Sequence, residues 1–180
     1  MKPKWIILIS FFGGILAAII ASVLVLFSGV INMGADVKPG FIEQTLAPWA
    51  LDRSVEWHAS KEKNPYADNP AAIAAGCADY RENCVMCHGA PDVSRAGLSK
   101  GLNPPAPPLS IQDDTPDGEL FWLIKHGIRM TPMPAFAPTH SDEEIWKIVA
   151  FVRHLPALTT QERESLQSAT AEKTHHQEKP

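Results

Sequence analysis

The pentapeptide Cys84-Val85-Met86-Cys87-His88 is the most informative segment of this 180-residue chain. Two cysteines three positions apart, with a histidine directly after the second, have the spacing for covalent haem attachment. The two thiols would add to the two vinyl groups of the porphyrin, and the imidazole of His88 would bind the iron as its proximal ligand. The motif therefore predicts one haem c, bound covalently through Cys84 and Cys87.

Two other kinds of site also use paired cysteines. A thioredoxin-like redox dithiol requires a βαβ context, which the sequence around the motif does not provide. A zinc site requires four well-spaced ligands. Only Cys77 remains as a further cysteine, and the adjacent Cys87 and His88 are poorly placed to bind one tetrahedral ion together. The residues favour haem attachment over both alternatives.

The N-terminal part of the chain carries a long apolar run. No charged residue occurs from Trp5 to Ile31, and this length corresponds to about 40 Å of helix, enough to cross a bilayer core of ~30 Å. Lys2 and Lys4 precede the run, so the N-terminus is expected in the cytoplasm and the rest of the chain on the outer side. A cleaved signal peptide is the alternative, but its apolar region would be shorter.

The charge of the remaining chain restricts the class of partner. Lys2 and Lys4 are two of the 16 basic residues, so 14 basic and 20 acidic residues follow the apolar run. An acidic domain argues against binding to nucleic acid and favours a protein partner with a basic docking patch.

Between the apolar run and the motif, the sequence predicts a linker over 36–69 and then a helix. Apolar residues recur at roughly helical intervals over 41–58, which indicates either an amphipathic helix or a solvated spacer. Asn69-Pro70 has the composition of a helix start. Ile73, Cys77, Tyr80 and Cys84 would form its buried face, with Cys77 as a small core residue.

A proline-rich segment follows the motif, Asn103-Pro104-Pro105-Ala106-Pro107-Pro108-Leu109. Such a run cannot form a regular helix, and its carbonyl groups remain available as acceptors. One of them would accept a hydrogen bond from Nδ1–H of His88 and fix the orientation of the ring. A second helix is then expected from Pro116 to about His126, ended by Gly127. His126 is interpreted as a surface residue near the helix C-terminus, with a ligand role as the alternative.

The segment from Arg129 to Phe136 is expected to supply the second axial ligand of the iron. Prolines on both sides of Met133 restrict the backbone and stiffen the loop that would hold its sulfur in place. Met130 lacks this bracing and is the alternative ligand. Ligation by histidine and methionine would raise the reduction potential relative to two histidines.

The C-terminal part contains two helix-start signals. Ser141-Asp142-Glu143-Glu144 forms a capping box that opens a helix running to about Leu155. Thr159 and Glu162 form a second box, which predicts a short helix followed by a disordered polar tail from Ala169. The expected organisation is an anchor at 1–35, a linker at 36–69, a haem domain at 70–158, and a short helix with a tail at 159–180.

With these parts in order, residues of about 70–156 resemble class I cytochrome c. The resemblance implies an all-α haem domain, here preceded by one transmembrane helix, in which Gly76 and Tyr80 cross the last helix at Ile148 and Phe151. It also implies that the carbonyl of Pro107 binds the proximal histidine. The segment 121–136 resembles short membrane-attached bacterial monohaem cytochromes, in which the methionine of Met-Pro-Ala-Phe, here Met133, binds iron. The haem-pocket residues implied are Pro107, Leu109, Trp122 and Phe136.

The expected function is that of an electron carrier rather than an enzyme. The chain would transfer single electrons between periplasmic or membrane redox partners, from the periplasmic side of a bacterial inner membrane. Two alternatives remain open at this point. The chain could be the haem subunit of a larger dehydrogenase or oxidase complex, or a haem protein that reacts with peroxide or a gas.

Overall fold

The computed structural model describes residues 3–109 and 114–175, and within these ranges the chain is helical with no β-strand. The predicted all-α fold class is therefore confirmed. Two compact units divide the chain, with the boundary between Lys38 and Pro39, and each is described by itself.

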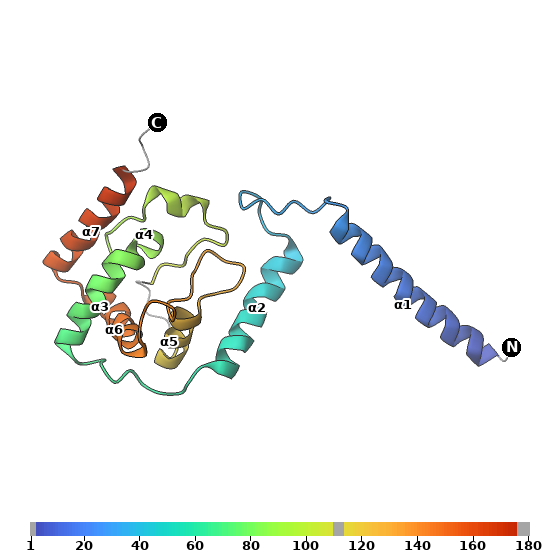
Figure 1. Cartoon of the computed structure of the whole chain (residues 1–180), viewed down its shortest axis with the longest axis horizontal. Helices are drawn as coiled ribbons and strands as arrows, with labels where there is room; N and C mark the ends of the chain where they lie inside the picture. Colours follow the sequence, from blue (N-terminus) through green and yellow to red (C-terminus); the bar gives the residue numbers. More distant parts are fainter. Residues whose placement is uncertain (1–2, 110–113, 176–180) are drawn as a thin grey trace. The chain divides into compact units, whose positions relative to one another are not determined.

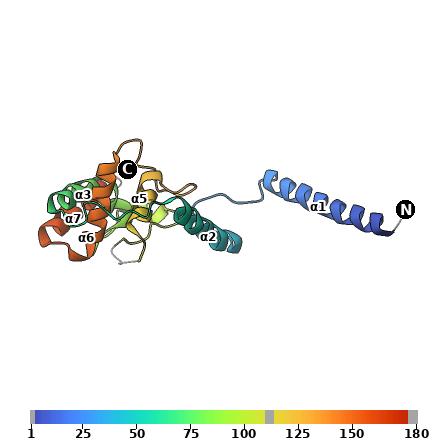
Figure 2. The ribbon, with the colours of Figure 1, turned by 90° about the horizontal axis from the view of Figure 1, so that it is seen from below.

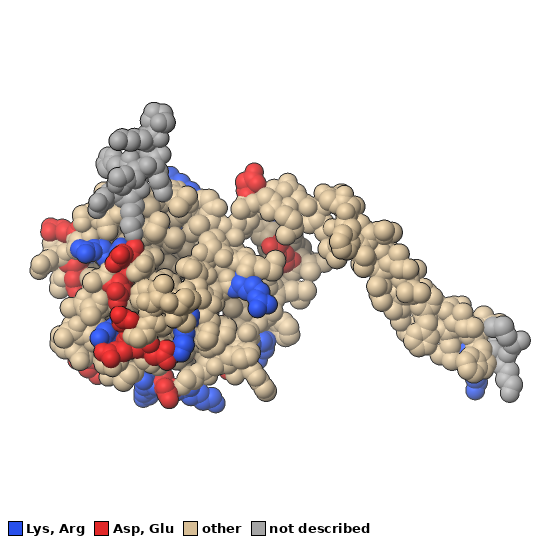
Figure 3. All heavy atoms as spheres, in the orientation of Figure 1, with Lys and Arg blue, Asp and Glu red and all other residues tan. Residues whose placement is uncertain are grey.

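The first unit contains one helix, α1 (Pro3–Phe27). Its segment Lys4–Phe27 is 24 residues long and apolar enough to cross a membrane by length and composition. Figure 3 shows no charged side chain along α1 except near its N-terminal end. Soon after Phe27, Gly29 takes a positive φ of 73°, which suits glycine and stops the helix from continuing.

The second unit contains the remaining helices (Figure 1). These helices are α2 (Phe41–His58), α3 (Pro70–Asn83), α4 (Val85–His88), α5 (Asp117–His126), α6 (Asp142–His154) and α7 (Thr160–His175), with 3₁₀ turns at Gly97–Gly101 and Leu155–Ala157. The linker region thus contains a helix over the range that the apolar pattern indicated. Helix α5 begins one residue later than predicted, with Pro116 as its N-cap.

Helices α3 and α6 cross and pack closely on each other (Figures 1 and 2). The side chain of Asn69 caps α3 by accepting hydrogen bonds from the backbone N–H groups of Ala71 and Ala72, as the Asn-Pro start predicts. A Cβ at Gly76 would lie 2.0 Å from the carbonyl oxygen of Lys147, so only glycine allows this approach. Beside the crossing, the rings of Tyr80 and Phe151 pack with centroids 5.3 Å apart. The predicted crossing of Gly76 and Tyr80 with the last helix is confirmed.

The buried face of α3 differs from the predicted one. Ala72, Gly76 and Tyr80 are the buried residues, whereas Ile73, Cys77 and Cys84 are half-buried at the edge of the core. The close crossing explains the difference, because it places the small residues directly under α6 and moves the larger neighbours to the sides. Cys77 is thus a peripheral core residue rather than a fully buried one.

Helix α6 forms most of the core surface. Its capping box is present, since Ser141 accepts from the N–H of Glu144 and the Glu144 carboxylate accepts from the N–H of Ser141. Its buried side chains include Ile145, Ile148, Val149 and Phe151, and Trp146 stacks on Phe121 of α5 with ring centroids 4.3 Å apart. The sequence predicted both this helix and its capping box.

Helix α7 is longer than the sequence predicted. The expected box is present, with the Glu162 carboxylate accepting from the N–H of Thr159 at 2.8 Å. The helix then continues through Ala169 to His175, where a disordered tail was expected; residues 176–180 lie outside the described residues. Burial explains the extension, because Leu166 is fully buried and Thr170 nearly so. Arg163 also forms an ion pair with Asp92, in the turn that follows the cysteine motif.

We expect Gly76→Ala to destabilise the domain by about 1–3 kcal/mol, because the new methyl group would force α3 away from the backbone of α6. Gly101→Ala is the matched control, since nothing lies within 4 Å of a Cβ at that position. Guanidinium unfolding followed by helical circular dichroism measures both variants. Equal stability of the two variants would contradict the importance of the crossing.

Candidate haem site

The motif forms a single tight turn at the end of α3. Cys84 is the C-cap of α3, and its carbonyl accepts from the N–H groups of Cys87 at 3.0 Å and His88 at 2.9 Å. Val85 points into the core and is fully buried, while Cys84, Cys87 and His88 are half-buried. One buried valine thus anchors the turn and leaves the three predicted haem-binding side chains at the edge of the core.

Tyr80 and Gly89 fix the path of the chain after the motif. The Tyr80 hydroxyl is buried and donates a 2.6 Å hydrogen bond to the carbonyl of Gly89. Gly89 has a positive φ of 67°, and a Cβ there would lie 2.8 Å from the carbonyl oxygen of Val93. Burial raises the pKa of Tyr80 far above its ordinary value, so the hydroxyl remains a donor at all ordinary pH values. Sequence reasoning missed this hydrogen bond.

The imidazole of His88 is oriented by the proline-rich segment. Its Nδ1 lies 2.8 Å from the carbonyl oxygen of Pro107, which accepts only, so Nδ1 carries the proton. Burial lowers the pKa of His88, against the opposing effect of this hydrogen bond, and Arg95 lowers it further. The ring is therefore neutral near pH 7, with the lone pair of Nε2 available to a metal. The contact between these two residues is the one that the family resemblance implied.

The methionine segment is a loop that hydrogen bonds pin to itself and to α5. The N–H of Ile128 donates to the carbonyl of Met133 at 3.2 Å, and the N–H of Phe136 donates to the carbonyl of Ile124 at 3.2 Å. Gly127 permits the close return of the loop, because it has a φ of 63° and a Cβ there would lie 2.5 Å from the backbone of Pro134. The loop holds Met133 half-buried against the hydrophobic core. Met130 has a side chain 85% exposed to solvent.

The four predicted pocket residues fall in different surroundings. Leu109 packs against the hydrophobic core, as do Cys84 and Met133, and Phe136 is part of that core. Pro107 is exposed and contributes its carbonyl to His88. Trp122 lies among rings instead, stacked on His58 of α2 at 6.0 Å and tilted against His126 at 5.0 Å. His126 is exposed, in keeping with its interpretation as a surface residue.

The remaining cysteine shows no sign of metal binding or enhanced reactivity. Burial raises the pKa of the Cys77 thiol, and the nearby Glu162 raises it further, whereas Arg81 opposes the shift. A thiol with a raised pKa is a poor nucleophile at pH 7. Among the described residues, no three His, Cys, Asp or Glu side chains gather as a metal site would require. The zinc alternative therefore gains no support from this part of the chain.

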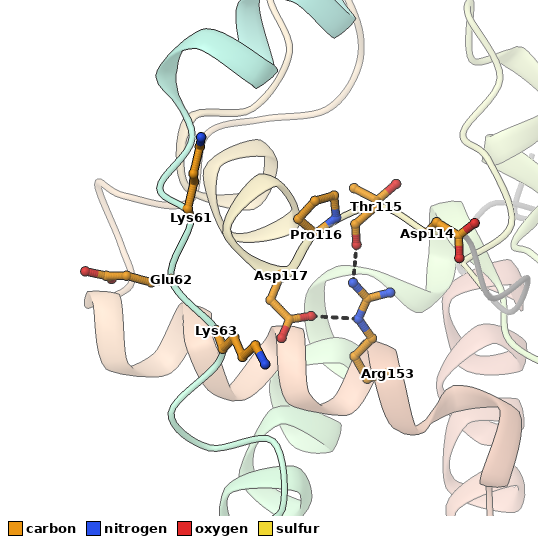
Figure 4. Close-up of a pocket in the computed structure, with 8 residues that line it drawn as sticks. All are labelled: Lys61, Glu62, Lys63, Asp114, Thr115, Pro116, Asp117 and Arg153. Carbon is orange, nitrogen blue, oxygen red and sulfur yellow. Dashed lines mark hydrogen bonds and ion pairs between the residues drawn. The ribbon is translucent and has the colours of Figure 1, made fainter.

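A second polar cluster lies where α5 begins, away from the motif (Figure 4). The guanidinium of Arg153 donates to the Asp117 carboxylate at 2.8 Å and to the carbonyl of Thr115. The backbone N–H of Asn64 donates to the other Asp117 oxygen at 3.2 Å, and the Asn64 side chain donates to the carbonyl of Trp146 at 2.9 Å. These contacts tie the linker, α5 and α6 together, which is a structural role.

Gly118 is the sequence feature that indicates the close approach of the linker to α5. A Cβ at Gly118 would lie 1.8 Å from the carbonyl oxygen of Ser60, so the linker crosses directly over the start of α5. A glycine in the first turn of a helix indicates a close approach, but not which segment approaches.

The crossed helices α3 and α6, the cysteine–histidine turn between them and the pinned methionine loop form the arrangement expected of a cytochrome c domain. Residues 71–152 match a family model described as "Cytochrome C oxidase, cbb3-type, subunit III". This segment is therefore a cytochrome c domain, and the recognition of class I cytochrome c from the sequence is confirmed. Such domains carry electrons on a haem, and electron transfer is the activity that the domain defines.

One matching solved structure is that of cytochrome CL from the marine methylotrophic bacterium Methylophaga aminisulfidivorans MPT. The two chains are 20% identical, the match covers 82% of this chain and 83% of that one, and the TM-score is 0.41. No curated protein matches the chain.

We expect Tyr80→Phe to destabilise the domain by roughly 1–3 kcal/mol, because it leaves the buried carbonyl of Gly89 without its donor. Tyr66→Phe is the matched control, since Tyr66 is half-buried and packs through its ring beneath Lys147, a contact that phenylalanine retains. Thermal unfolding of both variants measures the difference. A loss in the control as large as that in Tyr80→Phe would contradict the role of this hydrogen bond.

Proposed function

We propose that this protein is a membrane-anchored monohaem c-type cytochrome that passes single electrons between periplasmic or membrane redox partners. One haem would be attached to Cys84 and Cys87, with His88 and Met133 as the axial ligands. The observation that carries the proposal is the 2.8 Å hydrogen bond from Nδ1 of His88 to Pro107, because it leaves Nε2 for the iron.

The residues around the motif fit a covalently held haem. The two cysteines share one turn with His88, so one rigid segment would provide both attachment points and the proximal ligand. When bound, haem iron supplies reversible one-electron chemistry between its ferrous and ferric states. The protein would orient the imidazole through Pro107, and Leu109 and Phe136 would offer apolar surface next to the group.

We expect Cys84→Ala/Cys87→Ala to lose the covalent pigment, because no thiol would remain to add to the vinyl groups. Cys77→Ala is the matched control and should retain it, since Cys77 lies on another turn of α3. The measurement is haem retained on the polypeptide after denaturation and acid–acetone extraction. A wild-type chain without retained pigment would end the proposal.

Burial and backbone conformation favour Met133 over Met130 as the distal ligand. Met133 packs against the core in a braced loop, whereas the side chain of Met130 is 85% exposed. Met130 also has a φ of 60°, which places it at the tip of a turn rather than in the pinned part of the loop.

We expect Met133→Ala to abolish the methionine–iron(III) charge-transfer band and to open the ferrous protein to carbon monoxide. Met130→Ala should leave both properties as in the wild type, which makes it the control. Absorption spectra with and without carbon monoxide measure both. Rapid carbon monoxide binding by the wild type would instead favour the peroxide- or gas-reactive alternative.

The proposed anchor is α1, with the cytochrome domain on the periplasmic side of a bacterial inner membrane. Its support is the span Lys4–Phe27 and the lysines at positions 2 and 4, which favour a cytoplasmic N-terminus.

A second candidate function is a subunit of a larger redox complex. The matched family is described as an oxidase subunit, which favours this possibility. Purification from membranes in mild detergent distinguishes the two, because a subunit brings its complex with it and a shuttle does not.

A further inference from the structure

Helix α2 carries two apolar stripes on opposite faces. The inner stripe is Leu51, Val55 and His58, spaced i, i+4 and i+7, and it faces the domain. Val55 is buried, and His58 stacks on Trp122 of α5. This stripe contributes to the packing of α2 on the domain, whereas the opposite face of α2 is exposed.

The outer stripe runs along the exposed side of α2. Its members follow the spacing i, i+4, i+7, i+11 and i+15, and they are Ile42, Leu46, Trp49, Arg53 and Trp57. The exposed fractions are 70% for Ile42, 63% for Trp49 and 85% for Trp57. Arg53 is the one charged member of the stripe, and its other members expose apolar side chains that water solvates poorly, which is typical of an interaction site.

We propose that the outer face of α2 lies in the headgroup region of the lipid bilayer; this rests on the proposed anchoring by α1. Thirteen residues separate Phe27 at the end of α1 from Phe41 at the start of α2. That segment spans at most about 47 Å, which is short enough for a surface of α2 to reach the membrane. Two of the four apolar residues in the stripe are tryptophans, the side chain that most favours the boundary between hydrocarbon and water.

The charges of α2 indicate what kind of membrane contact this is. Glu43, Asp52 and Glu56 outnumber Arg53, which pairs with Glu56 at 2.8 Å. Attraction to anionic lipids therefore contributes little, and the contact depends on burial of the apolar side chains. A zwitterionic bilayer is sufficient for it.

Contact between the outer face of α2 and the membrane would orient the cytochrome domain as well as hold it at the surface. The inner stripe fastens α2 to α5, so insertion of the outer stripe holds the α5 side of the domain toward the membrane. A domain held in this way would exchange electrons with membrane partners through a restricted part of its surface.

Photo-crosslinking from the haem-loaded full chain in phosphatidylcholine nanodiscs tests the proposal. Benzoylphenylalanine replaces Trp49 in one variant. In the control it replaces the exposed Glu164 on α7, which lies at the opposite end of the domain from α2 (Figures 1 and 2). We expect several-fold more lipid adduct at position 49 than at 164, with a yield that anionic lipid does not raise. Mass spectrometry of the digested peptides measures the adducts.

Three results would overturn the proposal. Equal adduct yields at the two positions would show that the outer face is not in lipid. A polypeptide adduct in place of lipid, in native membranes, would assign this face to a protein partner. Release of the chain by carbonate extraction would contradict both the proposed anchor and this inference. If the chain is retained but forms no lipid adduct at position 49, only this inference is contradicted.

Discussion

The close crossing of α3 and α6 is the constraint on which the cytochrome domain depends. Gly76 allows the backbone of α6 to lie where a side chain would otherwise stand, since a Cβ there would be 2.0 Å from the Lys147 carbonyl oxygen. One turn later on α3, Tyr80 packs on Phe151, and its hydroxyl donates a hydrogen bond to the carbonyl of Gly89. The crossing thus determines how far the Tyr80 side chain reaches into the core, and the hydrogen bond from Tyr80 fixes the path of the chain immediately after the motif. A shift of α3 by a methyl radius would move both ends of the cysteine–histidine turn.

The two loops that flank the proposed haem are held by backbone groups rather than by regular structure. The carbonyl of Pro107 fixes the ring of His88, and prolines around it restrict the conformations that this segment can take. On the other side, hydrogen bonds from Ile128 and Phe136 pin the methionine loop to itself and to α5. Both loops therefore have few conformations available before any ligand is bound, which would reduce the entropy lost if Met133 binds iron as proposed.

Sequence reasoning succeeded where the signal is local and failed where it depends on a partner segment. The Asn69 cap, both capping boxes and the motif are short patterns, and the structure contains the first three as predicted. The buried face of α3 was wrong at Ile73, Cys77 and Cys84, because helical periodicity does not reveal which side another helix will cross. Helix α7 continues past Ala169 for a similar reason, since its polar sequence is stabilised by packing of Leu166 and by contacts to Asp92. The axial ligands and pocket residues remain predictions that the geometry supports.

The helices outside the matched segment restrict access to the domain from two directions. Helix α2 covers the α5 side through His58 and Trp122, while α7 packs on α3 and α4 and holds the Pro91–Asp92 turn through Arg163 and Gln167. Figure 3 shows acidic side chains gathered over the face formed by α3, α6 and α7. Electrostatic attraction would draw a redox partner with a basic patch toward that face once the two surfaces are within about one Debye length of each other. Final docking, however, requires an approach that neither α2 nor α7 blocks, so these two helices limit which surface can exchange electrons.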